Sequence, residues 1–122
     1  MPEQARSIEP VSLDAEDSAG VEQARTALVD SETAGDVARL FKALSDPTRV
    51  RLISILAEHE VCVHSLVEAL GMTQSAISHQ LQTLRALRVV RSRKAGKHVY
   101  YRLHDRHIAD LFRQGLAHTR HD

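Results

Sequence analysis

One carboxylate and three imidazoles near the end of the chain have the types and spacing of metal ligands. Asp105 and His107 stand at the start of a predicted final helix, and His118 and His121 stand near its end. His118 follows His107 by eleven residues, which is about three helical turns, so both rings project from one edge of the helix. Three imidazoles and one carboxylate suit tetrahedral zinc and leave no open position for water. This closed ligand set indicates metal sensing rather than catalysis.

A single helix cannot assemble this site. At about 1.5 Å of rise per residue, the two ends of the helix lie roughly 16 Å apart, whereas zinc holds its ligands at about 2 Å. If a second copy packs antiparallel, Asp105 and His107 of one chain come beside His118 and His121 of the other, and twofold symmetry gives two equal sites. An apolar stripe on the same helix needs a partner to cover it, which favours this arrangement. The stripe comprises Ile108, Leu111, Phe112, Gly115 and Leu116.

Cys62 and His64 form a candidate secondary metal site, because they are predicted to alternate on one extended segment. Cys62 is the only cysteine in the chain, and a cysteine between valines is more often a small core residue than a ligand. Residues 1–58 contain no histidine. Completing a soft-metal site here would therefore require carboxylates from the N-terminal segment.

The polar side of a predicted helix-turn-helix has side chains that suit DNA. Residues 71–73 join a helix over residues 65–70 to a longer helix, which Thr73 caps and which runs to about Leu87. Glutamine, serine and arginine on its polar side match base edges and phosphates, although such a stripe alone is also typical of an ordinary solvated helix. A following hairpin adds four cations within residues 91–97, which could bind the DNA backbone or enter a minor groove. The predicted DNA-contacting residues are Thr73, Gln74, Ser75, Ser78, His79, Gln82, Arg85, Arg91, Arg93, Lys94 and Lys97.

The charge distribution favours duplex DNA as the partner. Residues 1–36 hold nine acids and two bases, whereas residues 37–122 hold fourteen bases and seven acids. A compact body with excess positive charge favours an anionic partner. With only two tyrosines and two phenylalanines, the chain lacks the aromatic platform on which single-stranded RNA modules stack bases.

The elements before the helix-turn-helix are predicted from local signals. Residues 1–18 are acidic and nearly free of large apolar side chains, which predicts a disordered tail. A short helix is expected over residues 21–28, and an amphipathic helix from Ser31. Asp46 and Pro47 then break this helix and start another, as an N-cap and a first helical residue. The apolar side of the amphipathic helix comprises Val37, Leu40, Phe41 and Leu44.

The elements after it complete a mainly α fold with a small β-hairpin. Residues 89–103 are expected to form the hairpin, or wing, with its turn at residues 95–96. The final helix is expected over residues 106–121. Residues 19–122 therefore form one winged helix-turn-helix domain that combines DNA binding and metal sensing.

Size and composition exclude several classes of protein. A chain of 122 residues allows one small domain rather than an enzyme with separate cofactor and substrate domains. No apolar run approaches the roughly 20 residues of a membrane span, and the first residues lack a secretory pattern. A lone cysteine cannot form an internal disulfide, so a reducing, cytoplasmic location is expected. The usual hydrolase and nucleotide-site motifs are missing.

Three segments carry a resemblance to a known family. They are L-F-K-A-L-S-D-P-T-R at residues 40–49, S-A-I-S-H-Q-L at residues 75–81 and H-V-Y-Y at residues 98–101. From about residue 36 onwards the chain resembles the ArsR/SmtB metalloregulators. The resemblance implies a dimeric winged-helix repressor whose N- and C-terminal helices form the dimer interface, and which leaves its operator when metal binds.

The resemblance also implies which residues sense the metal. Zinc and cobalt sensors of this family carry the pattern D-x-H-x10-H-x2-(E/H) on the last helix, and Asp105, His107, His118 and His121 fit it. In similar zinc sensors the histidine that matches His118 hydrogen-bonds toward the position of His79, which would couple metal to DNA. The family's cysteine-centred site is incomplete here, which disfavours lead, cadmium or arsenite sensing.

The sequence thus predicts a homodimeric repressor that binds operator DNA without metal and is released by Zn(II). Co(II) and Ni(II) accept the same nitrogen and oxygen donors, so a repressor that responds to either ion remains an alternative. A metal-independent winged-helix DNA-binding protein is a second alternative. A zinc hydrolase would need an open coordination position and a general base, and the sequence displays neither.

Overall fold

The computed structural model describes residues 15–120, which fall into two compact units that divide between residues 34 and 35. In the first unit, helix α1 (Ala15–Ala27) has no buried residue. It begins before the helix predicted from Val21 and so includes residues 15–18 of the predicted tail. Acidic side chains in its first turn favour this earlier start, because the positive end of the helix dipole attracts them. The remainder of the predicted tail, residues 1–14, lies outside the described residues.

Helix α2 (Ser31–Ala43) begins at the predicted residue and continues from the first unit into the second. The Asp30 side chain accepts a hydrogen bond from the Thr33 backbone amide at 3.3 Å, which satisfies a free donor at the helix start. Only Ala43 is buried on this helix. The chain therefore leaves much of the predicted apolar side of α2 uncovered, including Phe41, which is 51% exposed.

Helix α3 (Pro47–Leu56) begins as the sequence predicts. Asp46 is its N-cap and accepts from the Arg49 backbone amide at 3.1 Å, and the proline occupies the first turn. The Arg49 guanidinium turns back to the end of α2, where its Nε donates to the Ala43 carbonyl at 2.6 Å. One arginine thus satisfies a helix-end carbonyl and links the end of α2 to the first turn of α3.

The helix-turn-helix is confirmed in place and in its capping. Helix α4 (Val63–Leu70) ends at Gly71, which adopts the left-handed conformation at φ 65°. Helix α5 (Gln74–Ala86) begins at its N-cap Thr73, whose hydroxyl accepts from the Ala76 backbone amide at 3.1 Å. The helical period predicts an inner side of α5 formed by Ile77, Leu81, Leu84 and the stem of Arg88. Arg88 lies beyond the helix end and is exposed, whereas the rest of this side is fully buried.

The wing is part of a three-stranded antiparallel sheet in the order β1-β3-β2. Strands β2 (Val90–Ala95) and β3 (His98–Leu103) form the predicted hairpin. Its turn lies one residue later than predicted, because Ala95 still pairs with His98. Gly96 follows at φ 62°, in the first central position of a two-residue turn where glycine is favoured. Strand β1 (Val61–Cys62), which was not predicted, pairs with β3 and is too short to show a sequence period.

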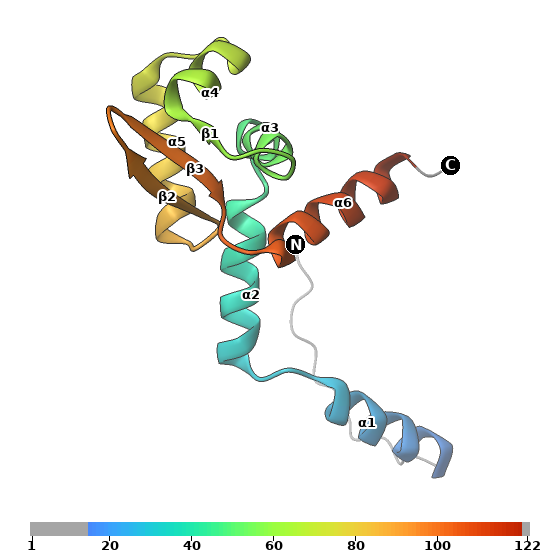
Figure 1. The fold of residues 1–122 in the computed structure, drawn as a ribbon. Coiled ribbons are helices and arrows are strands. Elements are labelled where there is room, and N and C mark those ends of the chain that lie inside the picture. The colour runs from blue at the N-terminus through green and yellow to red at the C-terminus, as the bar shows by residue number, and fades with distance from the viewer. Residues whose placement is uncertain (1–14, 121–122) are drawn as a thin grey trace, which may run out of the picture. The chain divides into compact units, whose positions relative to one another are not determined.

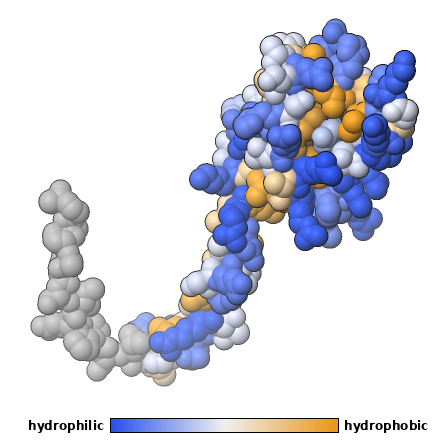
Figure 2. All heavy atoms as spheres, turned by 90° about the vertical axis from the view of Figure 1, so that its left-hand side faces the viewer, coloured by the Kyte–Doolittle hydropathy of each residue, from blue (hydrophilic) through white to orange (hydrophobic). Residues whose placement is uncertain are grey.

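The core lies between helices α3, α4 and α5 and the inner face of the sheet, and the start of helix α6 (Arg106–Arg120) packs against it. Figure 1 shows the wing on one side of this core and α6 leading away on the other. Figure 2, which views the wing side, shows mostly hydrophilic residues around a smaller hydrophobic patch. No helix among residues 15–120 has the length and apolarity to span a bilayer. The buried residues outside the inner side of α5 are Ala43, Leu52, Ile53, Leu56, Leu66, Val89, Val90, Tyr101, Leu103, Ile108 and Ala109.

Candidate metal and nucleic-acid sites

Two of the predicted metal ligands lie together at the start of α6. The Asp105 carboxylate accepts from the His107 backbone amide at 2.9 Å and lies 3.2 Å from His107 Nδ1. The His107 side chain is 86% exposed. Desolvation raises the pKa of Asp105, but hydrogen bonds from His107 outweigh it, so the pKa of this carboxyl lies below its ordinary value. The hydrogen bond fixes the two residues relative to each other, and the His107 ring remains accessible to solvent.

The other predicted ligands belong to the far end of the same helix. His118 lies in the last turn of α6 and is exposed, whereas His121 lies outside the described residues. Within residues 15–120, no three histidine, cysteine, aspartate or glutamate side chains come close enough to hold a metal ion. In the described part of one chain, two predicted ligands therefore lie at the start of α6 and a third, His118, lies at its end.

The prediction that Cys62 and His64 alternate on one extended segment is wrong. Strand β1 ends at Cys62, and the chain enters α4 at the next residue, so His64 lies on a helix and is exposed. Residues two apart on a helix do not face each other, so the expected alternation along one strand is lost. Cys62 Sγ instead lies 3.4 Å from the Ser65 hydroxyl, which lowers the pKa of the thiol below its ordinary value.

Helix α5 presents the predicted polar side to solvent. Gln74, Ser75 and His79 are exposed, and so are the later Gln82 and Arg85. Ser78 is half-buried between them. The Thr73 hydroxyl is engaged as the helix cap. The apolar side of the helix thus packs on the core, and its opposite side is accessible to a partner.

Of the four predicted wing cations, Arg93 is held in an ion pair and the other three are not, among the described residues. Arg91, Lys94 and Lys97 are exposed, and no side-chain ion pair is formed by them with another described residue. Arg93 is held by Glu60: its Nε lies 3.1 and 3.0 Å from the two carboxylate oxygens, and its Nη2 donates to Oε1 at 2.7 Å. This hydrogen bonding lowers the pKa of Glu60 and raises that of Arg93.

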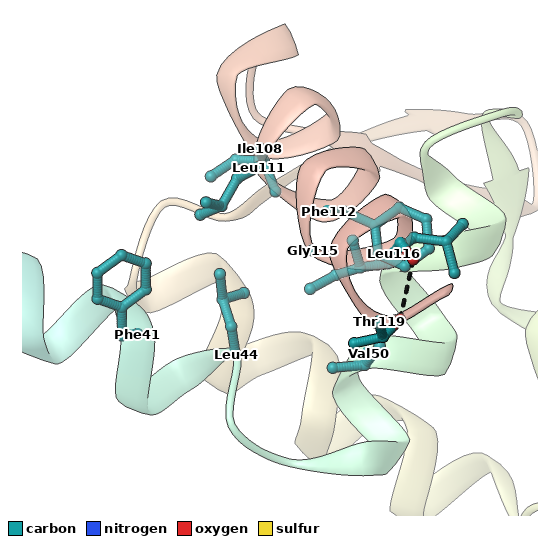
Figure 3. A pocket seen from close by; sticks show the side chains of 10 residues that line it. Phe41, Leu44, Val50, Ile108, Leu111, Phe112, Gly115, Leu116 and Thr119 are labelled. Carbon is teal, nitrogen blue, oxygen red and sulfur yellow. Dashed lines mark hydrogen bonds between the residues drawn. The ribbon is translucent and has the colours of Figure 1, made fainter. Parts of the chain in front are cut away.

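An apolar groove that sequence analysis did not predict lies between the end of α2, helix α3 and helix α6. It encloses about 360 Å³. Figure 3 shows the side chains of α6 facing Leu44 and Val50 across it. The apolar period of α3 predicts that Val50 is buried, yet it is 37% exposed because none of residues 15–120 fills this space. The groove is lined by Phe41, Leu44, Val50, Ile53, Ile108, Leu111, Phe112, Gly115, Leu116 and Thr119.

Helix α6 is anchored to the rest of the domain by Arg113. Its Nη2 donates to the Ala57 carbonyl at 2.9 Å and lies 3.3 Å from the Glu58 carboxylate. The carbonyl belongs to the end of α3, where the helix leaves acceptors without partners. The helix that carries the metal candidates is therefore tied directly to the end of α3.

A helix-turn-helix followed by a β-wing defines the winged helix-turn-helix class of DNA-binding regulators. Residues 46–92 match the family model described as bacterial regulatory protein, arsR family. The chain is 42% identical over 98 residues to the transcriptional repressor SmtB homolog of Synechocystis, which covers 80% of this chain and 74% of that protein. The chain belongs to the ArsR/SmtB family of metal-sensing transcriptional regulators, and its relatives are regulators rather than enzymes.

Two solved structures share the fold. One is a homodimeric winged helix-turn-helix DNA-binding domain from Mycobacterium bovis, with a TM-score of 0.67 and 31% identity, covering 79% of this chain and 93% of that one. The other is the AntR antimony-specific transcriptional repressor, with a TM-score of 0.68 and 38% identity, covering 74% of this chain and 82% of that one. Both confirm the predicted winged helix-turn-helix architecture.

Proposed function

We propose that the protein is a homodimeric transcriptional repressor that binds operator DNA without metal and leaves it when Zn(II) binds. The observation that carries the proposal is the placement of ligand candidates at opposite ends of one exposed helix, which borders an unfilled apolar groove. Such a helix needs a second copy both to cover its apolar side and to complete a ligand set.

The groove supports dimerisation through α2 and α6. Phe41 and Val50 are large apolar side chains that the single chain leaves in contact with water. Clustered apolar surface of this kind marks an interaction site. The M. bovis relative is a homodimer, which favours a second copy of this chain as the partner. Around a twofold axis the same groove would be used by both chains.

The donor chemistry supports zinc. We assign Asp105 and His107 of one protomer, with His118 and His121 of its partner, as the residues that would hold the ion. Nitrogen and oxygen donors suit Zn(II), and also Co(II) or Ni(II), which remain the alternative signals. Antimony, the signal named for the AntR relative, is softer and prefers thiolates, of which this chain can offer one. When bound, the metal would supply fixed bonds that link the two α6 helices.

The polar side of α5 and the wing would bind the operator. The α5 set would read base edges in the major groove, while the wing cations without an ion-pair partner among the described residues, Arg91, Lys94 and Lys97, would bind backbone phosphates. His118 would then couple the two sites through a hydrogen bond toward His79 at the reading helix, since an outer hydrogen bond orients a ligand ring. A regulator of this kind works in the compartment that holds the DNA, so a cytoplasmic location is part of the proposal.

A zinc titration of a protein–operator complex tests the proposal. The operator is first selected from a random duplex pool with metal-free protein and then labelled for fluorescence anisotropy. Because coupling free energies are typically 1–3 kcal/mol, zinc should weaken operator binding by about 5- to 150-fold. Parallel titrations with Co(II) and Ni(II) rank the signals. Operator binding that is unchanged or tighter at saturating zinc would contradict the proposal and favour a metal-independent regulator.

A further inference from the structure

We propose that Arg91 and Arg102 form a two-arginine clamp for a DNA phosphate on the outer face of the wing, while Arg93 is a positioning residue that does not bind DNA. The inference rests on the proposed DNA binding and assigns which wing residues carry it. It adds Arg102, which the sequence did not single out, and removes Arg93, which it did.

The strand register places the two arginines of the clamp directly opposite each other. Arg91 of β2 pairs with Arg102 of β3, and both are exposed. Opposed residues of an antiparallel pair share one face of the sheet, with Cα atoms about 4.5–5.5 Å apart. Like charges in such a pair destabilise a sheet. An anion bound between them relieves this repulsion.

The nearest compensating acid is already engaged by a different arginine. The pKa of Glu60 is lowered mainly by the hydrogen bond from Arg93. The positive charge of Arg102 lowers it further, but by less. Neither clamp arginine forms an ion pair with any other side chain of the described residues. Their two charges are thus available to a ligand.

Arg93 lies two residues along the same face and has a contrasting environment. Its guanidinium donates hydrogen bonds to the Glu60 carboxylate, the shortest at 2.7 Å. It also lies over the ring of Tyr100, its partner in the strand register, with the guanidinium carbon 4.8 Å from the ring centre. The carboxylate compensates the charge, and the ring holds the guanidinium plane. This arrangement fixes the wing to the segment before β1 rather than offering a cation to solvent.

The face that carries the clamp must point outward. The alternate residues of β3, Tyr101 and Leu103, are buried in the core, so Arg102 between them projects away from it. The wing lies on one side of the molecule in Figure 1, and that side is mostly hydrophilic in Figure 2. A phosphate of duplex DNA fits this clamp, because guanidinium groups bind phosphate oxygens with paired hydrogen bonds.

The salt dependence of duplex binding, measured with metal-free protein by fluorescence anisotropy, tests the assignment. Each lost phosphate contact lowers the slope of log affinity against log salt by about 0.9. Because the proposed dimer carries two wings, Arg91→Gln and Arg102→Gln should each reduce the magnitude of this slope by about twice that amount, and Arg102→Lys should keep it. Arg93→Gln should leave the slope unchanged. Glu60→Gln should steepen it, because it releases Arg93 to bind phosphate, an effect that loss of structure would not produce.

Arg120→Gln is the matched control, because it removes the same charge from the exposed end of α6, opposite the wing in Figure 1. The clamp would be overturned if Arg102→Gln had the same slope as this control and Arg93→Gln had a lowered slope. The proposed DNA binding itself would not be affected by that result. Wild-type protein that bound no duplex would overturn the proposed function as well. Thermal unfolding of each variant confirms that the fold is retained.

Discussion

His118→Ala is expected to leave operator binding by the metal-free protein intact and to abolish its loss on zinc addition. The side chain is exposed on α6 and contributes nothing to the core, so the fold should not change. Removing an outer-shell partner of a metal site typically costs 10–100-fold in affinity, and loss of a ligand should exceed about 100-fold. Zinc affinity by competition with a chromophoric chelator and operator affinity by anisotropy measure the two effects.

His64→Ala is the matched control for this prediction. It removes another exposed histidine, two residues after the one cysteine of the chain, and should leave both zinc affinity and zinc-induced release unchanged. If His64→Ala instead removed the response and His118→Ala did not, the sensing site would lie at the start of α4. The assignment to α6 would then be wrong.

Leu116→Glu is expected to convert the protein to monomers that bind neither operator nor zinc tightly. Leu116 lines the apolar groove but is not part of the single-chain core, so the substitution places a charge where the proposed partner packs. Truncation of a hot-spot residue near the centre of an interface costs about 2 kcal/mol or more, and a buried unpaired charge costs further. Dimer dissociation should rise by at least about 30-fold, as measured by sedimentation equilibrium.

Gln114→Glu controls for charge on the same helix. Gln114 is exposed and does not line the groove, so this variant should remain dimeric. Circular dichroism should show a native helix content for both variants. A dimeric Leu116→Glu protein would show that the groove is not the interface, and the shared metal site would lose its structural basis.

The helix-turn-helix could be predicted from sequence because its signals are local. Thr73 and Asp46 each bond to a backbone amide three residues on, and Gly71 supplies its own left-handed conformation. Such signals need no knowledge of the rest of the fold. The inner side of α5 was predicted for a similar reason, because a helical period of apolar residues identifies the buried side directly.

The features that sequence analysis missed depend on contacts between distant residues. Glu60 meets Arg93 across 33 positions, and no local pattern connects them. Strand β1 exists only because β3 lies beside it. The exposure of Phe41 and Val50 follows from an unfilled groove between three helices. An apolar period predicts that a side chain will be covered but not whether its own chain or a partner covers it.

The metal-ligand candidates could be predicted from the sequence only in part. Helical spacing placed His107 and His118 on one helix, and the structure confirms α6 as that helix. Spacing could not supply the bonds between His107 and Asp105, which orient one half of the set. Whether the second half comes from the partner is a property of two chains, and it remains a prediction until two chains are tested together.

A mixed dimer tests the shared site most directly. One protomer carries His107→Ala and the other carries His118→Ala, and the heterodimer is isolated with two different affinity tags. If each site takes ligands from both chains, one site of this heterodimer has lost both histidines and the other is fully intact. Neither homodimer should bind zinc tightly, whereas the heterodimer should bind one ion with wild-type affinity. A heterodimer that binds no better than its parents would contradict the account.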